Sequence, residues 1–154
     1  MNLSEKEKAL LCDLKAEEQL CVEKYTRYES TAHDTALKNL FAEIKATEAE
    51  HLATVIKVMH GDQVEVGACP TAKDSVTKCM ASSVSPEEKK QDAYLLKDAL
   101  MTEKQVSSVY NSAVFEFKNP ALRDVLSHMQ KEEQDHGERL YSYMAINGMY
   151  SSEC

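Results

Sequence analysis

Two acid–histidine pairs stand at helical spacing in the sequence: Glu48-x-x-His51 and Glu133-x-x-His136. Residues three apart on an α-helix project to the same side, about one turn from each other, so each pair can hold a metal ion between its side chains. Of the five histidines, only these two follow an acidic residue at that interval. The spacing therefore indicates metal binding by two helices.

The two pairs belong to an internal repeat with an offset of 85 residues, which aligns the two halves of the chain without a gap. The same offset superposes six ionisable side chains in three pairs: Glu18 on Glu103, Glu48 on Glu133 and His51 on His136. Each of these residues interrupts an apolar stripe at about mid-helix, so we expect all six to face the protein interior.

Four carboxylates in an apolar interior would cost several kcal/mol per ion unless cations compensate them. Two divalent cations balance four carboxylates, and two neutral imidazoles complete the coordination. Mixed carboxylate and imidazole ligands suit iron or manganese better than zinc held by thiolates. We expect two iron ions, with manganese or a mixed pair as the alternatives and zinc as a substitute. A metal-free buried polar network is the competing interpretation.

The spacing assigns a role to each ligand. Each Glu-x-x-His pair anchors one metal, and Glu18 and Glu103 complete and bridge the two ions. Tyr25 and Tyr110 each follow a ligand glutamate by seven residues. A core tyrosine whose hydroxyl has a polar partner is preferred over a redox role, and a hydrogen bond to a ligand carboxylate is compatible with both. Four acidic residues flank the ligands off the stripes and are expected to be solvated: Glu17, Glu50, Glu132 and Asp135. No other catalytic or cofactor-binding residue is predicted.

Composition and periodicity predict the elements that position these residues. The 154 residues include only 4 Gly, 3 Pro and no Trp, which favours one mostly helical domain over an all-β fold. Apolar periodicity and capping residues predict four helices, at about 4–31, 34–60, 86–117 and 120–147. Residues 61–85 form a long crossover, with one helical turn expected near 72–80. The expected fold is an all-α four-helix bundle of two duplicated antiparallel hairpins.

Charge and cysteine content narrow the function classes. A formal net charge of -8 argues against nucleic-acid or anionic-membrane partners, and no apolar run is long enough to span a bilayer. The N-terminus lacks a secretory pattern, so a cytoplasmic location is expected. Five cysteines without a CxxC pair are expected to be free thiols, with crosslinking through Cys69, Cys79 or Cys154 as the alternative.

The pattern Glu18-x6-Tyr25, Glu48-x-x-His51, Glu103 and Glu133-x-x-His136 resembles the ferritin-like superfamily, which includes ferritins, bacterioferritins and rubrerythrins. The resemblance covers residues 4–148. It implies a bundle with a long connection between its second and third helices, a di-iron centre on these ligands, and a reaction with O2 or H2O2. An oxidase or peroxidase activity would need an electron donor that the sequence does not identify. Rubrerythrin's CxxC module is absent, and Ala49 stands where bacterioferritins carry a haem-ligating Met.

Within that superfamily, the segments KEKALLCDLKAEEQLCVEKYTRY and LKNLFAEIKATEAEHLATVIKVM are similar in character to the spore coat F family of endospore-forming bacteria. This second resemblance implies a structural protein of the spore coat whose metal site is stabilising or vestigial. The leading hypothesis is thus a di-iron oxidoreductase, and the alternative is a coat component. A homodimer is compatible with either.

Overall fold

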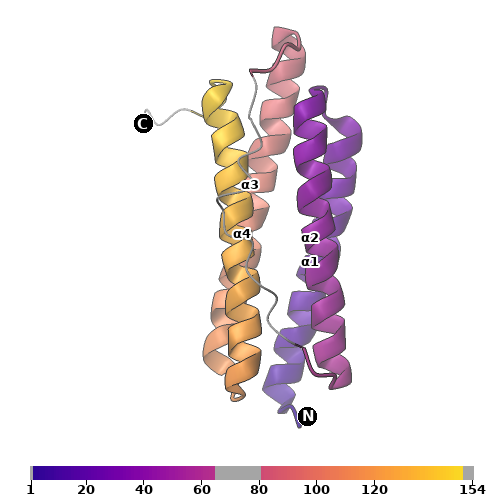
Figure 1. Ribbon diagram of the computed structural model, residues 1–154, viewed down its shortest axis with the longest axis vertical. Coiled ribbons are helices and arrows are strands. Elements are labelled where there is room, and N and C mark those ends of the chain that lie inside the picture. Colours follow the sequence, from indigo (N-terminus) through magenta and orange to yellow (C-terminus); the bar gives the residue numbers. More distant parts are fainter. Residues whose placement is uncertain (1, 65–80, 151–154) are drawn as a thin grey trace.

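The computed structural model describes residues 2–64 and 81–150. These residues form four α-helices and no strand: α1 (Glu5–Thr31), α2 (Thr35–His60), α3 (Pro86–Glu116) and α4 (Pro120–Ile146). α1 and α2 make one antiparallel hairpin, α3 and α4 make another, and the two hairpins pack side by side (Figure 1). The prediction of an all-α four-helix bundle is confirmed for the described residues. The predicted helix ranges differ from the observed ones by at most one residue at each end.

The order of the helices requires the long connection. α1 and α4 run upward in Figure 1, whereas α2 and α3 both run downward, so the chain leaves α2 at one end of the bundle and enters α3 at the other. A helix of 26 residues such as α2 is about 39 Å long at 1.5 Å per residue. The 25 residues from 61 to 85 can cover that length when extended. The helical turn expected near 72–80 lies outside the described residues.

Capping residues fix where the helices begin and end. Ser4 and Ser85 each form a capping box with the glutamate three residues later, which satisfies two backbone donors at each helix start. Asp34 and Asn119 cap α2 and α4 through their side-chain oxygens. Gly61, with φ of 85°, ends α2 in the left-handed conformation that glycine adopts without steric cost. Local sequence thus determines all four helix starts.

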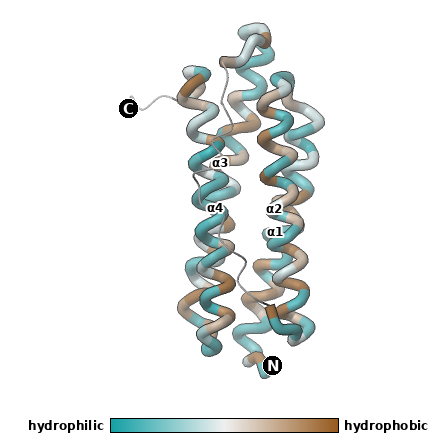
Figure 2. The backbone as a smooth tube through the Cα atoms, viewed as in Figure 1, coloured by the Kyte–Doolittle hydropathy of each residue, from teal (hydrophilic) through white to brown (hydrophobic). Residues whose placement is uncertain are grey.

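The core consists of two apolar clusters, one toward each end of the bundle. One is centred on residues such as Leu14, Val106 and Leu126, and the other on residues such as Phe41 and Leu140. Hydrophobic and hydrophilic positions alternate along every helix, as amphipathic packing requires (Figure 2). Along α2, α3 and α4 the predicted ligands lie between residues of the two clusters, whereas on α1 Glu18 lies between Leu14 and Cys21 of the first cluster, before Tyr25 of the second. Apolar residues therefore lie on both sides of the polar centre along the bundle.

Two buried carboxylates form hydrogen bonds between the hairpins, one at each end of the bundle. Glu7 of α1 accepts a hydrogen bond from the Lys118 backbone N–H in the α3–α4 turn at 2.9 Å. Asp92 of α3 accepts bonds from the backbone N–H groups of His33 and Asp34 in the α1–α2 turn at 2.8 and 3.0 Å. Glu7 and Asp92 are 85 residues apart and are 3% and 0% exposed. The internal repeat therefore includes a reciprocal contact between each hairpin and the turn of the other.

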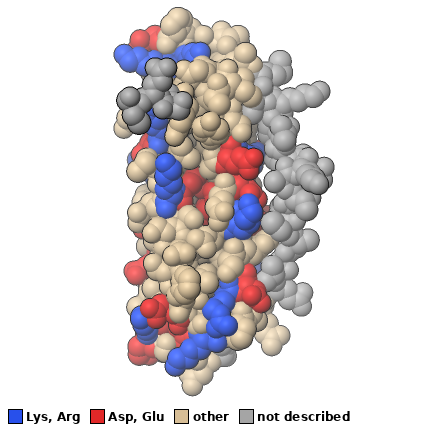
Figure 3. Space-filling model, turned by 90° about the vertical axis from the view of Figure 1, so that its left-hand side faces the viewer, with Lys and Arg blue, Asp and Glu red and all other residues tan. Residues whose placement is uncertain are grey.

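The outer surface carries mixed charge. On the face shown in Figure 3, basic and acidic side chains are interspersed without a continuous basic stripe. Across residues 2–64 and 81–150, no helix combines the length and apolar character that crossing a membrane would require.

Candidate metal centre

All six predicted ligands meet at the middle of the bundle, one glutamate from each helix and one histidine from each of α2 and α4. They are 0% to 3% exposed. They form two groups that share two members, namely Glu18, Glu48, His51 and Glu133 in one and Glu48, Glu103, Glu133 and His136 in the other. Within each group, one possible ligand atom from every residue lies within 4.8 Å of the others. The helical register thus converts the sequence repeat into two adjacent clusters.

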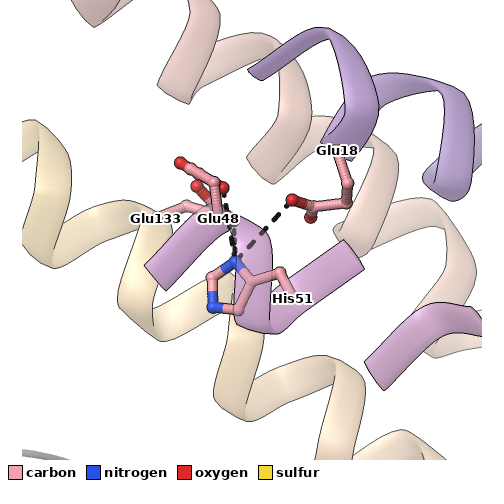
Figure 4. Close-up of side chains that lie close together, drawn as sticks. All are labelled: Glu18, Glu48, His51 and Glu133. Carbon is pink, nitrogen blue, oxygen red and sulfur yellow. Dashed lines mark ion pairs between the residues drawn. The ribbon is translucent and has the colours of Figure 1, made fainter. Parts of the chain in front are cut away.

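The first cluster surrounds Nδ1 of His51 (Figure 4). The carboxylate oxygens of Glu133, Glu48 and Glu18 lie 3.0, 3.4 and 3.9 Å from this atom. These carboxylates come from three helices and converge on the same side of the imidazole ring. Three oxygens and one nitrogen around a common point are a set of ligands suited to a divalent transition metal.

The second cluster repeats this arrangement around Nδ1 of His136. Oxygens of Glu48, Glu103 and Glu133 lie 3.2, 3.3 and 3.5 Å from that nitrogen. The two imidazole rings are stacked, with centroids 6.1 Å apart and an interplanar angle of 30°. The two clusters therefore lie next to each other in one buried polar centre.

The four carboxylates differ in the number of histidines that they face. Glu48 directs Oε2 toward His51 and Oε1 toward His136, and Glu133 directs Oε1 toward His51 and Oε2 toward His136. Glu18 faces only His51, and Glu103 faces only His136. Glu48 and Glu133, the shared carboxylates, thus each face both histidines, whereas Glu18 and Glu103, the terminal carboxylates, each face one. Bridging of two metal ions by Glu18 and Glu103 stays a prediction.

Tyr25 and Tyr110 each hold a terminal carboxylate across the interface between the hairpins. The Tyr25 hydroxyl donates to Glu103 Oε1, and the Tyr110 hydroxyl donates to Glu18 Oε1. Both tyrosines are fully buried, and burial together with the adjacent carboxylates raises the pKa of each phenol well above its usual value. The phenols remain proton donors at neutral pH and fix the direction of the terminal carboxylates.

Without a metal ion, burial and neighbouring charges shift the pKa values of the carboxyl groups in this centre. Burial raises the pKa of Glu18 to about 10, with further contributions from Glu133 and Glu48. Burial also raises the pKa of Glu103 to about 8. Burial acts in the same direction on Glu48, but contacts with His136 and His51 outweigh it and lower its pKa to about 2. The metal-free centre thus keeps the carboxyls of Glu18 and Glu103 protonated and the carboxyl of Glu48 ionised.

Burial and the neighbouring carboxylates also shift the pKa values of the two imidazoles. Burial lowers the pKa of both rings, but contacts with carboxylates outweigh burial and raise the pKa of His51 and His136 well above 6.5. Imidazolium groups supply in part the positive charge that the ionised carboxylates need.

Buried polar atoms without a hydrogen bond indicate whether the residues of the centre suit metal binding. Seven buried side-chain nitrogen or oxygen atoms among the described residues make no well-formed hydrogen bond, and six of them belong to this centre, where their neighbours are the ion-pair contacts given above. They are Glu18 Oε2, both oxygens of Glu48, both oxygens of Glu133 and His51 Nδ1. Leaving a buried polar group without a partner costs about 1–3 kcal/mol. Their convergence on common points is the arrangement that metal ligands require, so the residues fit two metal ions.

One neighbour of the centre contradicts the sequence prediction. Glu132, expected to be solvated, places Oε2 2.9 Å from Nε2 of His51, and its side chain is only 16% exposed. The same oxygen lies 3.4 Å from Nε2 of His128, one turn earlier on α4. The periodicity of α4 places Glu132 off the apolar stripe, but its partner is on α2. A pattern confined to one helix could not reveal that contact.

The described cysteines are Cys12, which is exposed, and Cys21, which is buried. Cys21 lies one turn from Glu18, and burial raises the pKa of its thiol, so the thiol is protonated and acts as a small apolar group. The expected crosslinking positions Cys69, Cys79 and Cys154 lie outside the described residues.

The architecture and the centre together define an all-α bundle with a buried carboxylate–histidine cluster. Residues 91–153 match the family model of the Coat F domain. No curated protein and no solved structure matches the chain. The matched segment covers most of α3, all of α4 and the ligands Glu103, Glu133 and His136. The match lies in the second hairpin and does not include the segments of the first hairpin that resemble the spore coat F family.

Proposed function

We propose that this protein is a spore-coat F-type protein that binds two transition-metal ions, iron in the first instance, at the centre of its bundle. The observation that carries the proposal is the group of six buried ligand atoms without a well-formed hydrogen bond on Glu18, Glu48, His51 and Glu133. Four carboxylates would neutralise two divalent ions, two neutral imidazoles would complete the coordination, and this ligand set suits iron or manganese.

The protein residues have separable tasks in such a centre. Glu48 and Glu133 each direct one oxygen toward each histidine, so with Nδ1 of His51 and Nδ1 of His136 they would hold the two ions. Tyr25 and Tyr110 orient the terminal carboxylates by donating to their second oxygens. The two apolar clusters, one toward each end of the bundle, exclude bulk water from the buried polar centre. Bound there, iron would supply the one-electron steps needed to reduce O2 or H2O2 with electrons from an external donor.

Metal stoichiometry tests the proposal directly. The chelator-treated protein, loaded anaerobically with Fe(II) and desalted, should retain two ions per chain. Glu48→Gln should lose both ions because Glu48 faces both positions, whereas Glu18→Gln should lose only one. The exposed Glu50→Gln is the matched control and should retain two. Retention of fewer than one ion by the unmodified chain, or equal retention by the Glu48 and Glu50 variants, contradicts the proposal.

The Coat F match favours a structural role in the spore coat as the second candidate function. In that role the metal ions stabilise the fold and need not turn over. A fluorescent fusion expressed in a sporulating host should then localise to the coat, and Glu48→Gln with Glu133→Gln should lower thermal stability without abolishing localisation. Oxygen consumption by the iron-loaded protein with a chemical reductant separates the two candidates, because only the oxidoreductase predicts repeated turnover.

A further inference from the structure

The two histidines of the centre differ in their surroundings, although the repeat makes them equivalent in sequence. Nε2 of His51 contacts the carboxylate of Glu132 at 2.9 Å. By contrast, every ion pair and hydrogen bond of His136 within the described residues is made by Nδ1. The outer nitrogen of only one of the two imidazoles is therefore held by an acidic side chain from the part of the chain that the structure describes.

The sequence explains this difference. Glu132 precedes the ligand Glu133, and the residue 85 positions earlier, before Glu48, is Thr47. Glu132 reaches across from α4 to His51 on α2, so the corresponding contact would run from Thr47 on α2 to His136 on α4. A threonine hydroxyl is carried on Cβ, so it reaches less far than a glutamate carboxylate, and it bears no charge. The duplication has thus preserved the ligands but not this acidic neighbour.

The contact has a defined effect on an imidazole ligand. A carboxylate that accepts the outer N–H holds the ring in one tautomer and orientation and raises the basicity of the nitrogen that faces the metal. Nε2 of His128 lies 3.4 Å from the same carboxylate oxygen. Loss of such a partner typically lowers metal affinity about 10- to 100-fold.

We propose that Glu132 is a positioning residue that makes the two metal sites unequal, so that the site of His51 binds its ion before the site of His136. The proposal rests on the function proposed above, because it requires both sites to bind metal. It assigns to Glu132 no contact with the ion itself.

Mn(II) titration of the chelator-treated full chain, followed by the EPR signal of the free ion, tests this proposal. The unmodified chain should bind in two steps whose dissociation constants differ at least about 10-fold. Glu132→Gln should weaken the first step about 10- to 100-fold, and the exposed Glu138→Gln should leave both steps unchanged. In a His51→Ala background, which removes the imidazole that Glu132 holds, Glu132→Gln should have no effect.

Thr47→Glu provides an independent variant, because it introduces the missing carboxylate on the other side of the centre. It should strengthen the second step and bring the two constants together, and circular dichroism should confirm that each variant is folded. Two equal steps in the unmodified chain, or unchanged steps in both Glu132→Gln and Thr47→Glu, would overturn the inference while leaving the metal site intact. If the unmodified chain binds no Mn(II) or Fe(II), the proposed function fails and this inference fails with it.

Discussion

Removing the metal ions should reverse the pH dependence of stability between pH 5 and 7. In the metal-free centre the pKa of Glu18 is about 10 and that of Glu103 about 8, against 4.5 for an ordinary glutamate. Over this window both carboxyls keep a proton in the folded chain that they lose in the unfolded chain. A raised pKa contributes stability that is complete below the unfolded value of 4.5 and is lost as pH rises through the folded value. The metal-free protein should therefore become less stable as pH increases.

The magnitude follows from proton linkage. Each additional proton bound by the folded state changes the free energy of unfolding by about 1.4 kcal/mol per pH unit. Two carboxyls give an upper limit of about 2.7 kcal/mol per pH unit by the same relation. His51 and His136, whose pKa values are raised above 6.5, act in the same direction above that pH. Lowered pKa values such as those of Glu48 and Glu7 affect stability only near and below the ordinary value of 4.5.

The metal-loaded protein should show the opposite slope. Ions compete with protons for the same oxygens and nitrogens, so their binding free energy increases as the ligands lose protons. The proposed ligands come together only in the folded chain, so the ions should bind that state and stability should rise from pH 5 to pH 7.

Urea unfolding at pH 5, 6 and 7 of chelator-treated protein and of protein with excess Mn(II) measures both slopes. Glu18→Gln should reduce the metal-free slope by about half, since one of the two linked protons is removed, and Glu50→Gln should leave it unchanged. A metal-free protein that gains stability from pH 5 to pH 7 would refute the assignment of protonated terminal carboxyls.

Three further substitutions test the packing around the centre. Asp92→Ala removes the acceptor of two backbone N–H groups in the α1–α2 turn and should lower the free energy of urea unfolding by about 3 kcal/mol; an effect below about 1 kcal/mol would show that the turn does not need it. Gly137→Ala, in mid-helix where a Cβ would lie 3.7 Å from Leu100 Cδ1, should raise the thermal midpoint through a gain of about 0.5–1 kcal/mol, and a loss would indicate a clash. Tyr110→Phe leaves Glu18 without its donor and should cost the metal-free protein about 1–3 kcal/mol by chemical denaturation, with no cost as the contrary result.

The helices could be predicted from the sequence because their determinants are local. Ser85 with Pro86 and Glu88, or Asp34 before an amphipathic run, identify helix starts without knowledge of the fold. The direction of each hairpin follows from its short turn. Segments with such signals leave few alternatives to antiparallel packing.

The burial and convergence of the six candidate ligands could also be predicted, because a repeated polar residue on an apolar stripe faces the core. The repeat does not predict which histidine each carboxylate faces. That contact depends on how the four helices pack and joins residues far apart in the sequence. The contact from Glu132 to His51 was missed for the same reason, because it joins residues on different helices.

One feature missed in the sequence had a usable signal. Glu7 and Asp92 are acidic residues at the repeat offset, and each stands on the apolar stripe of its helix four residues before a core leucine. The criterion that identified the ligands, a repeated acid on a core stripe, applies equally to them. Without a histidine nearby, that criterion indicates a structural carboxylate that caps a turn.

A single hairpin cannot form this centre, because each histidine is faced by carboxylates from both hairpins. His51 on α2 needs Glu133 of α4, and His136 on α4 needs Glu48 of α2. The segment that matches the Coat F domain supplies only three of the six ligands. A chain with one such hairpin would need a second copy related by a two-fold axis to complete the set. The crossover joins the two halves in one chain, which makes the pairing intramolecular and lets the halves diverge, as Glu132 and Thr47 have.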